Sequence, residues 1–278
     1  MMHRVYHKFP NFTSNNGTPT ALIYGVPMLL QSAIRDTEAD KVYVVFDGDH
    51  NPMRDKILPD YKKREPKLGF DAEAFYQQMS WLVDNLNSFG VHVVHQRGHE
   101  ADDWICILAR KLKAKHHVDI LSGDKDFHQL IRDNVWVYNQ THKRFIKPHS
   151  CKHHYNYTPK ECVDYLVLDG DKSDNIPGYP GFGPKTIRKF LDEHKSIRSF
   201  LKSDKSFGRV DKELMKEIYI RNKTLIDLVR FTRKYMKGLK VPIKKGKFDK
   251  KEIKRFAITY DIKTFTKTNF LEIYETLK

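Results

Sequence analysis

Acidic side chains gather in short groups along the sequence, each directly after an apolar run or at the start of an apolar helix. The eight members are Asp47, Glu100, Asp102, Asp103, Asp124, Asp126, Asp171 and Asp174. Carboxylates held a few ångströms apart repel one another and raise one another's pKa unless a cation neutralises them. Oxygen ligands without Cys or His are typical of Mg²⁺ or Mn²⁺ sites. We therefore predict a divalent-metal site built from these carboxylates.

The 278-residue chain as a whole is nevertheless basic, with a formal net charge of +15. This excess favours a polyanionic partner, nucleic acid before membrane, although generic basicity of a soluble protein is the alternative. Acidic metal ligands inside a basic protein indicate phosphodiester chemistry. The three cysteines are sparse and odd in number, which is typical of a reducing compartment. No apolar run approaches the ~20 residues that span a bilayer.

Strand and helix patterns alternate over the first two thirds of the chain, which predicts a mostly parallel sheet with helices on both faces. Expected strands cover residues 41–46, 91–94, 118–121 and 135–138, and expected helices cover 18–34, 71–89 and 100–113. Thr18 and Pro19 are predicted to start the first helix, and Pro27 to kink or divide it. Residues 1–17 are predicted to be irregular. Asp47 falls at the carboxyl end of a strand, where open α/β sheets carry their sites.

Residues 48–70 are basic and show no periodicity. Most such segments are solvated loops, but this one directly follows Asp47, which favours a mobile basic segment over the acidic site. Tyr61 could supply a stacking face for a base, with Lys62 and Arg64 as phosphate clamps.

A glycine-rich turn follows the last acidic pair. Gly178, Gly181 and Gly183 precede a helix that is predicted to begin near Lys185. Such a turn brings backbone amides close to a ligand, and amides at a helix N-terminus attract phosphate. Residues 204–236 are predicted to form one or two helices, 237–250 to be mobile, and 251–278 to hold one helix, a short strand and a second helix.

A zinc site is the alternative for a group of sulfur and nitrogen side chains. Its members are His149, Cys151, His153, His154 and Cys162. Their spacing matches no common zinc pattern, which favours a polar loop instead.

Seven stretches, in this order, resemble one known family. They are RVYHKFP (4–10), VVFD (44–47), YKKR (61–64), EADD (100–103), GDKD (123–126), GDKSDNIPG (170–178) and GFGPKT (181–186). The family is the phage and bacterial 5′ nucleases, flap endonuclease-type enzymes that include the 5′-nuclease domain of DNA polymerase I and phage enzymes called RNase H or 5′–3′ exonuclease. The resemblance covers residues 4 to about 230.

The resemblance implies a two-metal nuclease of DNA replication or repair. Asp47, Glu100, Asp102 and Asp103 match the first-metal group, and Asp124, Asp126, Asp171 and Asp174 match the second. Tyr61, Lys62 and Arg64 match a helical arch around the 5′ single strand, and Arg4 matches a basic residue near the active-site floor. Gly178, Gly181, Gly183, Lys185 and Thr186 match a helix-hairpin-helix-type motif that grips duplex DNA, in the family often around K⁺.

The implied fold is a PIN-like α/β nuclease domain over residues 1–165, with the arch at about 48–70, followed by a helical DNA-binding domain over 166–278. Implied substrates are DNA with 5′ flaps, nicks or ends and RNA–DNA hybrid, and implied partners are a replicative polymerase or a single-strand-binding protein. The implied location is the cytoplasm of a bacterium or a phage-infected host.

The sequence departs from the family at its start. The family begins with a strand ending in Asp before the segment that matches Arg4, and only Met1, Met2 and His3 precede Arg4 here. We therefore expect the functional protein to contain further N-terminal residues, from a misplaced start or a split gene. The alternatives to an active 5′ nuclease are a weakened DNA-junction binder and a PIN-type ribonuclease; the arch and the glycine hairpin argue against the latter.

Overall fold

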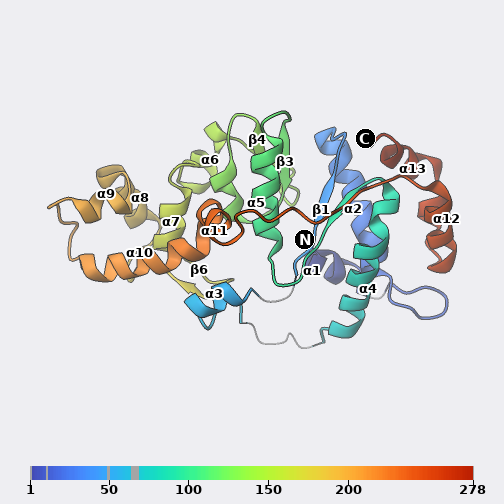
Figure 1. Cartoon of the computed structure of the whole chain (residues 1–278), viewed down its shortest axis with the longest axis horizontal. Helices are drawn as coiled ribbons and strands as arrows, with labels where there is room; N and C mark the ends of the chain where they lie inside the picture. The colour runs from blue at the N-terminus through green and yellow to red at the C-terminus, as the bar shows by residue number, and fades with distance from the viewer. Residues whose placement is uncertain (1, 11, 49–50, 64–68, 278) are drawn as a thin grey trace. The chain divides into compact units, whose positions relative to one another are not determined.

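The computed structural model describes residues 2–10, 12–48, 51–63 and 69–277. The chain forms two compact units that interleave along the sequence (Figure 1). Unit 1 comprises Met1–Gly48, Pro66–Arg97 and Val241–Lys278, and unit 2 comprises Asp49–Glu65 and Gly98–Lys240. The sequence analysis instead divides the chain at residue 165, and that division stays a prediction.

Unit 1 is built on a three-stranded sheet. Its strands are β1 (Tyr43–Val45), β2 (His92–Val94) and β8 (Ile243–Lys244), and its helices and 3-10 turns are α1 (Met2–Lys8), α2 (Ala21–Thr37), α4 (Ala72–Asn85), η1 (Leu86–Phe89), α12 (Lys250–Thr259), η3 (Lys263–Thr266) and α13 (Thr268–Glu275). β1 and β2 run parallel, with Val44 opposite Val93, whereas β8 pairs antiparallel with β2. Both valines are buried, as the apolar pattern predicts for a strand covered on both faces.

Several sequence expectations for unit 1 are wrong. Residues 2–8 form a helix, because Val5 packs so closely against α2 that a Cβ on Gly25 would lie 2.4 Å from Val5 Cγ1. Thr18 does not start α2: its hydroxyl donates to Asn16, and the helix begins at Ala21. Pro27 lies inside α2 without dividing it. The segment predicted to be mobile contains β8, and η3 replaces the strand expected near the C-terminus.

Unit 2 combines a small sheet with a helical layer. Its elements are α3 (Pro52–Ile57), α5 (Ala101–Leu112), β3 (Val118–Leu121), η2 (Lys125–Leu130), β4 (Val135–Asn139), β5 (Arg144–Ile146), α6 (Pro148–Tyr155), α7 (Cys162–Asp169), β6 (Gly170–Asp171), β7 (Ile176–Pro177), α8 (Pro184–His194), α9 (Ile197–Lys202), α10 (Lys212–Ile226) and α11 (Leu228–Tyr235). β3 and β4 pair in parallel, and β5 adds an antiparallel edge strand. The α/β core with an added helical region confirms the predicted fold class. The described sheets are mixed rather than mostly parallel, because β8 and β5 pair antiparallel with their neighbours.

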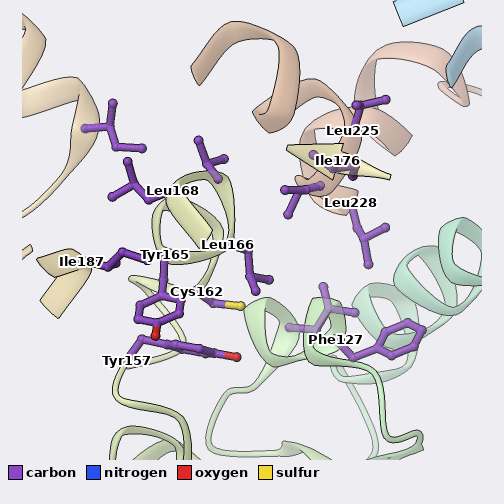
Figure 2. Packing of buried hydrophobic residues seen from close by; sticks show 14 of the residues in the cluster. Phe127, Tyr157, Cys162, Tyr165, Leu166, Leu168, Ile176, Ile187, Leu225 and Leu228 are labelled. Atoms are coloured by element: carbon purple, nitrogen blue, oxygen red, sulfur yellow. The ribbon is translucent and has the colours of Figure 1, made fainter. Parts of the chain in front are cut away.

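The core of unit 2 is centred on α7, whose apolar residues are buried against several neighbours. Figure 2 shows Cys162, Tyr165, Leu166 and Leu168 of this helix packed among Phe127 and residues of the other helices. Residues 148–155, predicted to be a polar loop, form α6 instead, with Cys151 buried in the same core. Across the described parts of both units, no helix is long and apolar enough to cross a membrane.

Candidate active site

Two loops of unit 2 carry the second group of predicted metal ligands. Asp124 precedes η2 and accepts a hydrogen bond from the Asp126 amide at 3.0 Å. Asp171 ends β6, where its Oδ1 accepts bonds from the Ser173 amide at 2.7 Å and the Ser173 hydroxyl at 2.6 Å. In both loops a carboxylate closes a short turn on its own backbone, as Asp commonly does. The turns therefore fix the direction in which each loop continues.

The core beneath these loops holds them in place. Phe127 follows Asp126 directly and is 2% exposed, and Leu168 is fully buried just before Asp171 (Figure 2). The buried Gln129 side chain donates to the Asp126 carbonyl at 2.8 Å and accepts from the Leu228 amide at 3.0 Å. The η2 turn is thereby bonded to the start of α11. Hydrophobic burial and one satisfied amide together position the acidic loops.

The first group contains a buried ion pair that the sequence did not reveal. Asp103 is completely buried, and both of its oxygens accept bonds from Arg54 of α3 at 2.8 Å. The same guanidinium lies 3.2 Å from Glu100 and stacks 3.8 Å from the ring centroid of Phe231. Burial by itself lowers the pKa of Arg54, but the bonds to Asp103 and the charge of Glu100 outweigh it and hold that pKa above its ordinary value. Arg54 therefore stays charged and links α3, α5 and α11.

Lys62 supplies the second positive charge at the acidic cluster. Its Nζ lies 2.6 Å from Glu100 Oε2 and 3.9 Å from Asp174 Oδ2. The Tyr61 hydroxyl donates to the same Glu100 oxygen at 3.2 Å. Burial raises the pKa of Glu100, but the charges of Arg54 and Lys62 outweigh it, and the pKa is lowered. The basic segment and the acidic groups thus form one electrostatic unit within unit 2.

Burial, together with repulsion between neighbouring acids, raises pKa values in the second group. Burial, followed by the charges of Asp124 and Asp102, raises the pKa of Asp126 well above its ordinary value. Burial also raises the pKa of Asp174 to about 6, although Lys62 partly offsets the rise and Asp171 adds to it. Carboxylates that raise one another's pKa in this way gain from a shared cation.

The donor set fits a divalent metal ion, but the carboxylates do not converge on one point. Within the described residues, no three His, Cys, Asp or Glu side chains lie close enough to hold a single ion. The mutual repulsion of the acids does not require such convergence, because charges interact over several ångströms whereas ligands must touch the ion. Hard oxygen donors are typical ligands of divalent ions, and the place of Asp102, Asp124, Asp126, Asp171 and Asp174 in such a site stays a prediction.

The remaining predicted site residues belong to other parts of the chain. Asp47 follows β1 and Arg4 lies on α1, so both belong to unit 1 and their place in the site stays a prediction. Arg64 lies outside the described residues. Tyr61 is 4% exposed, so its ring is not the open stacking face that the sequence suggested. Residues 51–63 also differ from a solvated loop, because they contain α3 and the buried Arg54.

The glycine hairpin joins the second acidic loop to α8. A Cβ on Gly178 would lie 2.4 Å from the Leu168 carbonyl oxygen, so only glycine fits where β7 passes the end of α7. Gly181 has φ +77°, a turn conformation that favours glycine, and Gly183 leads into Pro184 at the helix start. Lys185 is exposed and Thr186 half-buried in the first turn of α8, and their contact with phosphate stays a prediction.

The hairpin helix is anchored to α7 by an ion pair. Arg188 donates to Glu161 Oε1 at 2.8 Å, and the Thr158 amide donates to Glu161 Oε2, also at 2.8 Å. Burial raises the pKa of Glu161, but the bonds from Arg188 and Thr158 outweigh it and lower that pKa to about 2. The ordinary pKa is 4.5, so this carboxylate stabilises the fold fully above about pH 4.5 and loses its contribution as pH falls towards 2.

Glu161→Gln is therefore expected to lower the free energy of unfolding by about 1 kcal/mol above pH 4.5, a modest value because the pair is partly solvated. The gap to the wild type should close as pH falls to about 2. Urea unfolding between pH 2 and 7 measures this, with Glu217→Gln on the exposed face of α10 as the matched control. A gap that is the same at pH 2 and pH 7 would rule out the charge as its cause.

No sequence pattern marks Arg54 directly as a site residue. A weak signal was available: helix capping explains one acid at the start of α5 but leaves others, including Asp103, without a role. A buried acid requires a cation, and Arg is suited to a bidentate pair. The choice among the many basic residues of the chain depended on the fold.

Known proteins resemble this chain over most of its length. Residues 1–156 match the model of the 5′–3′ exonuclease N-terminal resolvase-like domain, and residues 157–254 match the 5′–3′ exonuclease C-terminal SAM fold. The chain belongs to the 5′–3′ exonuclease family. A 5′–3′ exonuclease of Aquifex aeolicus (strain VF5) is 34% identical over 232 residues, covering 82% of this chain and 79% of that protein.

Two further relatives of this 5′–3′ exonuclease family member extend the comparison. DNA polymerase I of Mycobacterium tuberculosis (strain ATCC 25618 / H37Rv) is 31% identical over 82% of this chain, which corresponds to 26% of that longer protein. The bacteriophage T5 flap endonuclease, solved in a pseudo-enzyme-product complex with DNA and metal ions, shares the fold with a TM-score of 0.64. It is 21% identical, and 91% of each chain is covered.

Proposed function

We propose that this protein is a structure-specific 5′ nuclease that hydrolyses phosphodiesters in DNA with two divalent ions, Mg²⁺ or Mn²⁺. The observation that carries the proposal is the single electrostatic unit formed by Glu100, Lys62, Asp174 and the acids around Asp126. Family membership supports the same conclusion, since the Aquifex relative is a 5′–3′ exonuclease. A DNA-junction binder without cleavage is not favoured.

Most of the acidic side chains are proposed to be metal ligands. Asp102, Asp124, Asp126, Asp171 and Asp174 would hold the ions, with Asp47 and Glu100 as further ligands. The bound ions would generate hydroxide, polarise the phosphoryl group and stabilise the leaving oxygen.

Positive side chains have a separate part in the reaction. Lys62 and Arg64 would place positive charge where the phosphate gains negative charge, and Arg4 would contribute at the floor of the site. Asp103 instead positions α5 through Arg54.

The glycine hairpin would hold the DNA duplex next to the phosphodiester that is cleaved. Backbone amides from Gly178 to Gly183 and the start of α8 suit a phosphate group, and the hairpin would be the site of the K⁺ ion. Lys185 and Thr186 would add direct phosphate contacts. DNA with 5′ flaps, nicks or ends and RNA–DNA hybrid are the proposed substrates. The proposed partners are a replicative polymerase or a single-strand-binding protein in the cytoplasm.

Cleavage assays test the proposal directly. Labelled 5′-flap, nicked and RNA–DNA substrates are incubated with Mg²⁺, with Mn²⁺ and with EDTA. We expect 5′-phosphate fragments with either metal and none with EDTA. Binding to the flap without cleavage under any of the metal conditions would instead support the junction-binder alternative.

Lys185→Ala is expected to weaken duplex binding similarly for all sequences and to reduce the slope of log K against log salt by about one unit, as for one lost phosphate contact. Fluorescence anisotropy with duplexes of different sequence, titrated with salt, measures both quantities. Lys202→Ala, which removes an exposed cation at the end of α9, is the control and should leave the slope unchanged. A loss confined to one sequence would contradict a phosphate contact.

A further inference from the structure

The basic segment is bonded to the second acidic loop by a set of hydrogen bonds with Asn175 at its centre. The Asn175 side-chain amide donates to the carbonyl of Asp60 at 2.9 Å and to the carbonyl of Lys63 at 2.6 Å. In the opposite direction, the Lys62 amide donates to the Asp174 carbonyl at 3.1 Å. All of these residues belong to unit 2. Both sides of the turn at residues 60–63 are thus fastened to one short loop.

The contact between Asn175 and the turn at residues 60–63 involves two unusual backbone conformations. Asn175 has φ 58° and Lys62 has φ 52°, which lie in the left-handed region that side chains other than Asn and Asp rarely adopt. Asn tolerates this conformation, whereas Lys is strained in it and needs the surrounding bonds to hold it. The bonds from Asn175 on either side of Lys62 supply that restraint.

We propose that Asn175 is a positioning residue: it fixes the backbone at residues 60–63 and so determines where the Lys62 ammonium stands relative to Glu100 and Asp174. A lysine side chain is long and flexible, so its charge is placed only as well as its backbone. Nζ lies 2.6 Å from Glu100 and 3.9 Å from Asp174 while the backbone is bonded to Asn175. The inference rests on the proposed nuclease function, for which it names a residue beyond the ligands and cations.

A side-chain amide suits this position. Both acceptors are backbone carbonyls, so the side chain must supply two N–H donors, and an Asp at this position would turn acceptor oxygens towards them. Asn175 is exposed to water, so its bonds add little to overall stability. Asp174 is its chain neighbour, and a cation bound at Asp174 would therefore be coupled to the position of the basic segment.

The test is a double-mutant cycle with Lys62 on flap DNA in the presence of Mg²⁺. Asn175→Gly keeps the left-handed backbone conformation accessible and removes the two side-chain N–H donors. Asn175→Asp keeps the side-chain size but places acceptor oxygens opposite the two backbone carbonyls. We expect each to lower kcat on the order of 10-fold with little change in KM, because misplacing a reacting charge costs rate rather than affinity. In a Lys62→Ala background, Asn175→Gly should cost less than 2-fold, since its effect passes through Lys62.

A matched control and a second measurement separate the possible failures. Asn156 also has a left-handed φ of 62°, at the end of α6, so Asn156→Gly makes the same change away from the acidic loops and should leave kcat unaltered. Hydrogen exchange of the Lys62 amide should be faster in Asn175→Gly than in the wild type, with or without activity. If the wild type cleaves no substrate, the proposed function fails while exchange still tests the contact between Asn175 and this turn. Equal losses with and without Lys62, or unchanged exchange, would overturn the role of Asn175.

Discussion

Asp171→Asn is expected to reduce metal-dependent cleavage by on the order of 10²–10³-fold while DNA binding stays near the wild-type level. The amide oxygen of Asn can still accept the bonds from the Ser173 amide and hydroxyl, so the turn keeps its shape. Only the charge disappears, and with it a proposed ligand of the second ion. Asp124→Asn, which likewise preserves the acceptor for the Asp126 amide, should behave in the same way.

Single-turnover cleavage of a 5′-flap substrate and anisotropy of the same DNA measure the two effects separately. Asp169→Asn is the matched control, because Asp169 is an exposed carboxylate only two positions before Asp171 and belongs to neither acidic group. Removing a negative charge near DNA can tighten binding, so a modest increase in affinity fits the assignment. Wild-type cleavage rates in both Asp171→Asn and Asp124→Asn would contradict the assignment of these residues as metal ligands.

Arg54→Met is expected to lower the free energy of unfolding by about 3–5 kcal/mol, the usual cost of breaking a buried ion pair on one side. Asp103 is completely buried, and both of its oxygens bond to Arg54, so the variant leaves a buried negative charge without its cation. Arg54→Lys should recover only part of the loss, because an ammonium cannot make the same two parallel bonds.

Denaturant unfolding measures these differences, and Lys56→Met, at an exposed position on the same helix, should shift stability by less than about 0.5 kcal/mol. The double variant Arg54→Met with Asp103→Leu removes both charges and should restore much of the stability, since apolar side chains can replace a buried ion pair. If the double variant is less stable than Arg54→Met, the unpaired carboxylate is not the source of the loss.

The prediction of this protein's function rested mainly on the motifs that follow one another in the order typical of the family. Acids at strand ends and helix starts occupy positions that local sequence defines, because a strand of apolar residues ends where polar residues begin. Asp124 and Asp171 were recognisable on this basis as candidate metal ligands. The glycines of the hairpin were recognisable as turn residues, and Gly178 and Gly181 occupy backbone positions that exclude or disfavour a side chain.

Short helices were predicted less well. α1 and α6 have 7 and 8 residues, too short to be stable through local propensity alone. They form because Val5 packs on α2 in unit 1 and Cys151 is buried in the core of unit 2. Such burial depends on residues distant in sequence and leaves little periodic signal.

By itself, the sequence determined the family and the α/β fold class with its helical addition, because both follow from residue types at short spacings; its assignment of the acidic groups as metal ligands stays a prediction. Only the tertiary structure decided which basic side chain pairs with which carboxylate. Arg54 and Asp103 are 49 positions apart, and Asn175 and Asp60 are 115 positions apart. The chain offers 50 Lys and Arg side chains of similar chemistry. Nothing local distinguishes the two that reach Glu100, because a pairing across that separation is set by how the helices and loops pack.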